Sequence, residues 1–154
     1  MHPSYNMRVG ANAVIVRDDH ILLVEFGAGW KRHFNLPGGG IEPGESVIAG
    51  LQREVREETG AAIRVGTLLL VTEYFPPQAH YQDGNLHKLG LVFRCQLQPG
   101  SEPHLPANPD PHQVAVQWVP LDDLPSQPLL PKIADQILTL VRTPPVYQLF
   151  YEPV

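Results

Sequence analysis

The sequence predicts an α/β fold of the α+β kind, in which a mixed β-sheet has helices packed on it. Apolar, β-rich runs recur along the chain, and two segments between them have the spacing of amphipathic helices. Strands and helices mixed in this way are typical of a sheet covered by helices. The 154 residues, 43% of them hydrophobic, are enough for one domain with a buried core. We therefore expect a single domain over residues 1–154, with its core at about 8–142 and an apolar tail at 143–154.

Composition and charge restrict the partners. The formal net charge of −5 argues against a surface built for long nucleic acids, which need a basic stripe. The start of the chain lacks the apolar segment of a secretory signal, and no apolar run approaches the length of a membrane span. Cys95 is the one cysteine, which excludes an internal disulfide and fits a reducing compartment. These observations predict a cytoplasmic protein that binds neither long nucleic acids nor membranes.

The first part of the chain predicts a hairpin, a loop and a helix. Residues 9–26 hold two apolar runs separated by "RDDH", the pattern of a β-hairpin with a short polar turn. The glycine- and proline-rich segment 27–45 predicts a loop, or a strand broken by tight turns. From Ser46 to about Thr59 apolar residues return at helical spacing, and Gly60 stands where helices commonly end.

The rest of the chain predicts three strands and one helix. Strands are expected at 62–75, 87–97 and 113–121, and a helix at 128–142. The proline-rich segment 98–112 cannot form regular structure, and a loop of that length in a compact domain is usually functional or disordered. The tail is apolar enough to pack on another surface, such as a second copy of the chain.

Three glutamates, Glu54, Glu57 and Glu58, are crowded near the end of the first predicted helix. Like charges at this spacing repel one another and weaken a helix. Glu54 and Glu58 are four residues apart, so they share a face, which lies beside the apolar stripe that turns towards the core. Carboxylates gathered in partly desolvated surroundings take up protons or bind a cation. Mg²⁺ suits them, because it prefers oxygen ligands and leaves coordination positions for water and substrate phosphates.

A solvated acidic face is the alternative for these glutamates, supported by an Arg53–Glu57 pair one helical turn apart. The inward position of Glu54 and Glu58 favours the metal site instead. So does the glycine-rich stretch "LPGGGIEPGE" directly before the helix, since its bare backbone lets a ligand approach closely.

The stretch from Gly39 to Ala61 resembles the Nudix box, the sequence motif of the Nudix hydrolase family. The family pattern is Gly-x5-Glu-x7-Arg-Glu-U-x-Glu-Glu-x-Gly-U, where U is a bulky aliphatic residue. Here Gly39 and Glu45 are followed, at the same spacings, by "REVREETGA" starting at Arg53. Every charged and glycine position agrees, and Ala61 is the one departure. The resemblance implies a mixed sheet sandwiched between helices, and it extends at lower specificity over about residues 8–142.

The resemblance also implies a hydrolase that cleaves a nucleoside diphosphate linked to another moiety, X. It implies four ligands for Mg²⁺ or Mn²⁺: the side chains of Glu54, Glu57 and Glu58 and the carbonyl of Gly38. Arg53 would orient a glutamate through a charge-assisted bond, and Glu45 would support the site or an additional metal ion. Cations suit this chemistry, because a pyrophosphate is anionic and repels the attacking hydroxide.

The general base differs between members of the family. Some use a glutamate of the box, and others use a glutamate in a downstream loop. Glu54 is the first candidate in this chain, and Glu102 in the proline-rich loop is the second. Near the last predicted strand, where many relatives carry a glutamate, this chain has Asp110, His112 and Gln113 instead. A histidine in a loop is more often a surface residue than a base, so Glu54 is preferred.

Few residues bear on the substrate. ADP-ribose pyrophosphatases of the family carry a proline shortly beyond the box, where this chain has Pro76. Proline is also common where a strand ends, so Pro76 alone does not decide. Lys31 and Arg32 are candidates to bind phosphates, Phe34 to stack on a base, and Gly39 to let the substrate approach the backbone. Solvated charges and a core aromatic are an equal alternative for the first three.

The favoured function is Mg²⁺-dependent hydrolysis of the pyrophosphate bond in ADP-ribose or a nucleotide-sugar-like substrate. One alternative is a mutator-type hydrolase of normal or 8-oxo nucleoside triphosphates. Another is a nucleotide-sensing domain without turnover, which the intact box disfavours. The isomerase branch of the superfamily needs a catalytic cysteine, whereas Cys95 lies in an apolar run and is more simply a core residue. The resemblance and the apolar tail are both compatible with a homodimer, and neither decides the oligomeric state.

Overall fold

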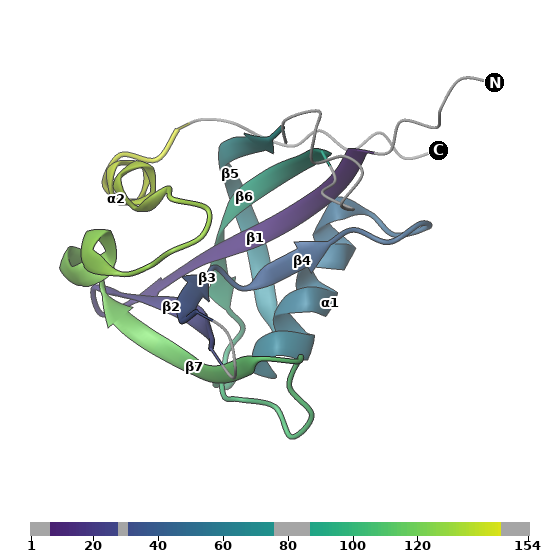
Figure 1. Cartoon of the computed structure of the whole chain (residues 1–154), viewed down its shortest axis with the longest axis horizontal. Coiled ribbons are helices and arrows are strands. Elements are labelled where there is room, and N and C mark those ends of the chain that lie inside the picture. Colours follow the sequence, from purple (N-terminus) through teal and green to yellow (C-terminus); the bar gives the residue numbers. More distant parts are fainter. Residues whose placement is uncertain (1–6, 28–30, 76–86, 146–154) are drawn as a thin grey trace.

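The computed structural model describes residues 7–27, 31–75 and 87–145. Within these ranges, seven strands form a mixed sheet with the order β3-β2-β1-β6-β5, while β4 pairs with β1 and β7 pairs with β2 (Figure 1). The strands are β1 (Met7–Arg17), β2 (His20–Phe26), β3 (His33–Asn35), β4 (Gly38–Gly40), β5 (Ile63–Tyr74), β6 (His87–Leu97) and β7 (Gln113–Pro120). The five predicted strands are confirmed, and the loop before the box contributes two short strands, β3 and β4.

Strand β1 belongs to both halves of the sheet. Its last two residues pair antiparallel with β2 across the turn Asp18–Asp19, whose φ angles of 49° and 59° suit a two-residue hairpin turn. The predicted hairpin is therefore confirmed. The first nine residues of β1 run parallel to β6, from Met7 opposite His87 to Ile15 opposite Cys95. This parallel pair, together with the antiparallel ones, makes the sheet mixed.

Helix α1 (Val47–Thr59) begins and ends where the sequence predicts. The Ser46 side chain accepts a hydrogen bond from the Ala49 N–H at 3.1 Å, which satisfies one of the amides left free in the first turn. Gly60 ends the helix with a φ of 69°, a left-handed conformation that glycine adopts without strain. The capping residues thus fix both ends of the helix that carries the glutamates.

Helix α2 (Ala134–Arg142) is shorter than the helix predicted at 128–142, and that prediction is wrong over its first six residues. Pro128 and Pro131 explain the difference, because proline lacks an amide hydrogen and disfavours the helical conformation in the residue before it. An unpredicted 3₁₀ helix, η2 (Leu121–Ser126), precedes this segment.

Each face of the sheet carries part of the core. Successive side chains of a strand point to opposite faces, so Ile15 of β1 packs with Leu51 and Val55 of α1, whereas Val14 packs in the cluster that holds Ile137 of α2. Figure 1 shows α1 and α2 on opposite sides of the sheet. The predicted sandwich of a mixed sheet between helices is confirmed.

Cys95 belongs to the core on the α1 face and is buried, as expected for a packing residue. Burial raises the pKa of its thiol to about 12, which leaves little of the reactive thiolate at neutral pH. None of the helices in the described ranges is both long and apolar enough to cross a membrane. The last nine residues of the apolar tail lie outside the described residues.

Candidate active site

The glycine-rich strand β4 lies between β1 and α1. Gly38 stands opposite Asn12 of β1, and Gly39 stands opposite Ala11. Gly38 has a φ of 144°, and a Cβ built there would lie 2.1 Å from the carbonyl oxygen of Ala11. Glycine is therefore required at this position, and it brings bare backbone within contact of the box helix.

Glu58 is buried at the junction of α1 and β4, with 6% of its surface exposed. It continues the apolar stripe of Leu51 and Val55, which explains why its carboxylate turns inwards. The Gly38 N–H donates a hydrogen bond to Glu58 Oε2 at 2.8 Å. Gln113 supports the same turn of helix from β7, because its side-chain amide donates to the Glu58 carbonyl at 2.7 Å. Within the described ranges, no cationic side chain forms an ion pair with the Glu58 carboxylate.

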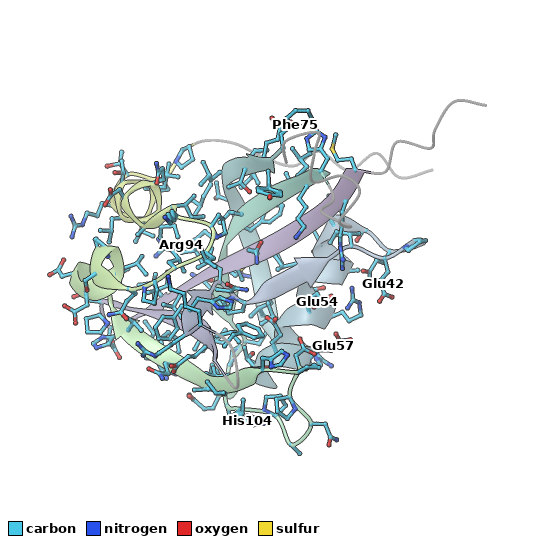
Figure 2. The ribbon with its side chains drawn as sticks, in the orientation of Figure 1. Glu42, Glu54, Glu57, Phe75, Arg94 and His104 are labelled. Atoms are coloured by element: carbon cyan, nitrogen blue, oxygen red, sulfur yellow. The ribbon has the colours of Figure 1, made fainter. Side chains whose placement is uncertain are left out.

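Glu54 and Glu57 extend the carboxylate cluster along α1, as Figure 2 shows. The Glu54 carboxylate lies against the bare Cα of Gly39, where an added Cβ would come within 2.5 Å of Oε2. The side chain of Glu54 is 17% exposed and that of Glu57 is 57% exposed. The three glutamates therefore form a gradient from buried to solvent-facing, beside one edge of β4.

Arg53 connects the box residues to one another. Its Nη2 and Nε donate to the two carboxylate oxygens of Glu45 at 2.6 and 3.0 Å, a bidentate pair. Its Nη1 donates to Glu54 Oε1 at 2.8 Å and to Glu57 Oε2 at 3.2 Å. Its Nη2 also donates to the Gly40 carbonyl at 3.1 Å, which ties the helix to β4. The guanidinium thereby contacts Glu54 and Glu57 of α1, and Glu45 before it, from a single point.

A model of the NUDIX domain matches residues 6–141 of the chain. The chain belongs to the Nudix hydrolase family. An ADP-ribose pyrophosphatase of Methanocaldococcus jannaschii is 36% identical over 94 residues, which cover 60% of this chain and 50% of the relative. The structure of a MutT NUDIX hydrolase from Burkholderia pseudomallei has a TM-score of 0.69 at 34% identity, covering 86% of this chain and 98% of that one.

Another solved Nudix structure, a NUDIX hydrolase from Nitrosomonas europaea, has a TM-score of 0.73 at 25% identity and covers 95% of this chain and 98% of that one. The expected Nudix fold is thus confirmed by structures of similar length. The chain spans half or less of the length of several curated relatives that it matches, such as the archaeal ADP-ribose pyrophosphatase.

The ionisation of the charged residues in the Nudix box follows from their burial and from the hydrogen bonds described above. Burial raises the pKa of Glu58 to about 8, and repulsion from Glu54, Asp110 and Glu57 adds to the rise, while the Gly38 N–H opposes it. The hydrogen bonds from Arg53, followed by the one from the Glu42 N–H, lower the pKa of Glu45 to about 2. The carboxylates of Glu45 and Glu54 in turn raise the pKa of Arg53 above its usual value. The box thus holds one carboxylate fixed in its charged form and another with a strong tendency to be protonated.

The carboxylate oxygens of the Nudix box are of the kind that bind a hard divalent cation. No three acidic, histidine or cysteine side chains in the described part of the chain are grouped closely enough to hold an ion as they stand. In this arrangement Glu54 and Glu57 accept hydrogen bonds from Arg53. Glu58 nevertheless keeps a buried carboxylate without an ion pair, and a charge in that position is unfavourable until a cation compensates it. Carboxylate oxygens are the ligands that Mg²⁺ prefers.

A cavity of about 720 Å³ opens beside β4, on the face of the sheet that α2 covers. Its wall includes polar and charged side chains that the sequence analysis did not single out: Arg8, Asn12, Thr72, Tyr74 and Lys88. Gly39 and Gly40 also line it, so the glycine-rich strand separates the cavity from the glutamates of α1. A hint existed in the sequence, since Gly10 and Gly90 interrupt two predicted strands. Without the pairing of β1 with β6, nothing indicated that they meet.

Other predicted site residues lie elsewhere. Glu102 forms an ion pair with Arg17 at 2.9 Å, at the end of β1, and is 71% exposed. The loop that carries it reaches the C-terminal end of α1, where the N–H of His104 (labelled in Figure 2) donates to the Thr59 carbonyl. Asp110 is the residue of the 98–112 loop that acts on Glu58 electrostatically. The Glu102 carboxylate is thus held by Arg17, and it is not among the charges that act on Glu58.

The residues before the box also lie apart from the glutamates. Phe34 is buried in the core on the α2 face, and the guanidinium of Arg32 covers its ring. Arg32 pairs with the buried Glu25. Lys31 and Arg32 line a separate cavity of about 400 Å³ near the start of α2. Pro76, the residue that bears on ADP-ribose, lies outside the described residues.

The Glu45–Arg53 pair predicts a distinctive acid sensitivity. Because the pKa of Glu45 is lowered from 4.5 to about 2, its contribution to stability is present above pH 4.5 and is lost as the pH falls towards 2. We expect the difference in melting temperature between the wild type and Glu45→Gln to be largest at neutral pH and to shrink over this window. Thermal melts in EDTA at several pH values measure it. A difference that stays constant through the window would show that the ion pair does not act as described.

Proposed function

We propose that this Nudix chain uses a divalent metal ion to hydrolyse the pyrophosphate bond of a small nucleoside diphosphate linked to another moiety, X. The observation that carries the proposal is Glu58. Its carboxylate is buried and lacks an ion pair within the described ranges, and it lies between two other carboxylates of α1 and bare glycine backbone. This arrangement is unfavourable in the absence of a cation and suits one that neutralises a pyrophosphate.

Each residue of the box has a proposed role. Glu54, Glu57 and Glu58 would hold Mg²⁺, or Mn²⁺ in its place, with the Gly38 carbonyl as a further ligand. When bound, the ion would neutralise the diphosphate and acidify the attacking water. Arg53 orients Glu54 through the 2.8 Å contact, and Glu45 fixes Arg53 in turn.

Glu54 is the proposed general base. Its carboxylate lies against Gly39, a residue that also lines the cavity, and Arg53 holds it in one orientation. A water attacking a phosphate at this point would pass its proton to Glu54. The carboxylate of Glu102, the second candidate, is instead engaged by Arg17 of β1, which supports the choice of Glu54.

Two substrate classes remain for X. A sugar is supported by the similarity to the archaeal protein called an ADP-ribose pyrophosphatase. A further phosphate, as in a nucleoside triphosphate, is supported by the similarity to the structure called a MutT NUDIX hydrolase. A substrate panel tests the proposal: ADP-ribose, nucleotide sugars, and normal and 8-oxo nucleoside triphosphates, each with Mg²⁺ or Mn²⁺, with products separated by chromatography. AMP from ADP-ribose or pyrophosphate from a triphosphate would support it, and no product from a folded sample would contradict it.

Binding of the metal should depend on pH. Because the pKa of Glu58 is raised to about 8, Mg²⁺ competes with a proton below that pH and not above it. We therefore expect Mg²⁺ to raise the melting temperature, and the rise to grow until about pH 8 and then level off. Melts with Mg²⁺ and with EDTA from about pH 6 to about pH 9 measure it. A Mg²⁺-induced shift of equal size at every pH would contradict binding through Glu58.

Three expectations about the whole chain stay predictions. These are a single domain over residues 1–154, a homodimer, and a cytoplasmic location. Size-exclusion chromatography with light scattering would test the second of them.

A further inference from the structure

Two positively charged side chains lie next to each other in the wall of the cavity beside β4. Arg8 of β1 and Lys88 of β6 are partners in the parallel register, and both line the cavity. Partners on neighbouring strands lie about 4.8 Å apart and share a face of the sheet. Like charges placed opposite each other destabilise a sheet. Neither side chain forms an ion pair within the part of the chain that the structure describes.

The acidic residue on the same wall does not neutralise this pair. Glu73 lines the cavity, but its carboxylate lies 2.6 Å from Nε2 of His87, on the neighbouring strand. Tyr74, opposite Lys88 in the register, adds a half-exposed ring and hydroxyl to the wall. The charged part of the cavity is therefore basic, whereas Leu36, Val92, Leu130 and Ile133 line its apolar part.

Arg8 is placed directly against the glycine-rich strand. A Cβ built on Gly40 would lie 2.5 Å from Nη2 of Arg8, so the missing side chain of Gly40 makes room for the guanidinium. The preceding residue, Gly39, leaves room for Glu54 in the same way. Consecutive residues of a strand face opposite sides. Glu54 and Arg8 thus lie on the two sides of β4, with only this strand between them.

We propose that Arg8 and Lys88 bind a phosphate group of the substrate other than the two joined by the hydrolysed bond. This inference rests on the proposed function. The metal at the box would already neutralise the hydrolysed diphosphate, so two further cations match an additional dianionic group, with Arg8 supplying a planar fork of donors. The pair then selects nucleotides that carry at least three phosphates, and ADP-ribose, which carries two, lacks the group that the pair binds.

The additional phosphate could have two sources, which the experiment separates. One is the terminal phosphate of a nucleoside triphosphate, and the other is a monoester on the ribose, as in ADP-ribose 2′-phosphate. The probes are therefore ATP, ADP-ribose and ADP-ribose 2′-phosphate. Their binding is measured by calorimetry in EDTA with the wild type, Arg8→Gln, Lys88→Gln and Lys88→Arg. Arg64→Gln removes an exposed cation from β5, far from the cavity lining, and serves as the matched control.

Arg8→Gln and Lys88→Gln should each weaken binding of one three-phosphate probe about tenfold, because each removes a charge-assisted hydrogen bond. Binding of ADP-ribose should change less than about twofold. Lys88→Arg should restore most of the affinity, and Arg64→Gln should leave all three probes unchanged. Melting temperatures without ligand should not fall in the glutamine variants, because each relieves a like-charge contact. Equal losses for ADP-ribose and the three-phosphate probes, or no loss for any, would overturn the proposal.

Turnover with Mg²⁺ distinguishes this inference from the proposed function. The glutamine variants should raise KM for the three-phosphate substrate while kcat stays close to that of the wild type, because the pair acts in binding. If the wild type turns over no substrate but the selective loss of binding in EDTA is found, the proposed function fails and the phosphate subsite stands. If turnover is found and the variants bind every probe as the wild type does, the subsite fails and the proposed function stands.

Discussion

Replacing Glu58 by glutamine is expected to lower kcat/KM by at least about 100-fold, because it removes a buried metal ligand that stabilises the transition state by several kcal/mol. The fold should be kept, since glutamine has the same shape and its carbonyl oxygen can still accept the hydrogen bond from Gly38. Steady-state kinetics with Mg²⁺ measure the loss. The Mg²⁺-induced rise in melting temperature should disappear in the same variant.

The stability of this variant provides a second readout. The pKa of Glu58 is raised from 4.5 to about 8, so the metal-free wild type loses stability as the pH rises through this window and the buried carboxyl ionises. Glutamine does not ionise, so Glu58→Gln in EDTA should melt above the wild type at pH values beyond 8. Glu42→Gln, which removes an exposed carboxylate from the loop before α1, is the control and should change neither property. Full activity of Glu58→Gln would show that Glu58 is not a metal ligand needed for turnover.

Gly38→Ala is expected to have the largest effect on stability, lowering the free energy of unfolding by about 3 kcal/mol or more. Two causes add together. The backbone φ of 144° is one that residues with a side chain rarely adopt, and the new Cβ would meet the Ala11 carbonyl oxygen at 2.1 Å and the Asn12 Cα at 2.7 Å. Relief would require β4 to move away from β1. Chemical denaturation measures the change, and the melting temperature should fall by roughly 6–12 °C.

Gly44→Ala separates the two causes. Gly44 has a φ of 86°, but no atom lies within 4 Å of its added Cβ. This variant should therefore lose only the conformational part, about 1–2 kcal/mol. Losses of equal size at the two glycines would show that backbone conformation alone, and not the collision with β1, sets the requirement for glycine at position 38.

Local patterns predicted the elements of this fold well. The limits of α1 follow from two local residues: Ser46 caps the first turn and Gly60 ends the helix. The hairpin follows from its apolar runs and polar turn. The helix predicted at 128–142 fails where apolar spacing competes with Pro128 and Pro131, and proline prevails because it removes a hydrogen-bond donor. The inward direction of Glu58 was also predictable, because it follows from helical geometry within one segment.

Residues brought together by long-range pairing could not be predicted. Glu102 was a candidate base because it lies in a long loop, yet the structure pairs it with Arg17, which is 85 residues away in the sequence. Arg8 and Lys88 belong to no sequence motif, and they lie side by side only because of the register of β1 against β6. Phe34 is a case that the sequence left open, since stacking on a base and packing in the core were equal alternatives until its burial was known.

The parallel pairing of β1 with β6 also has a consequence for how the protein folds. Met7 pairs with His87, which lies 80 positions further along the chain, and contacts of such high sequence separation slow folding. The cation pair and the wall of the cavity depend on this register, whereas α1 with its capping residues can form locally. A chain emerging from the ribosome would therefore carry the helix of glutamates well before it carries a closed substrate cavity. We expect the ability to bind nucleotide to arise in the last step of folding, together with the central strands.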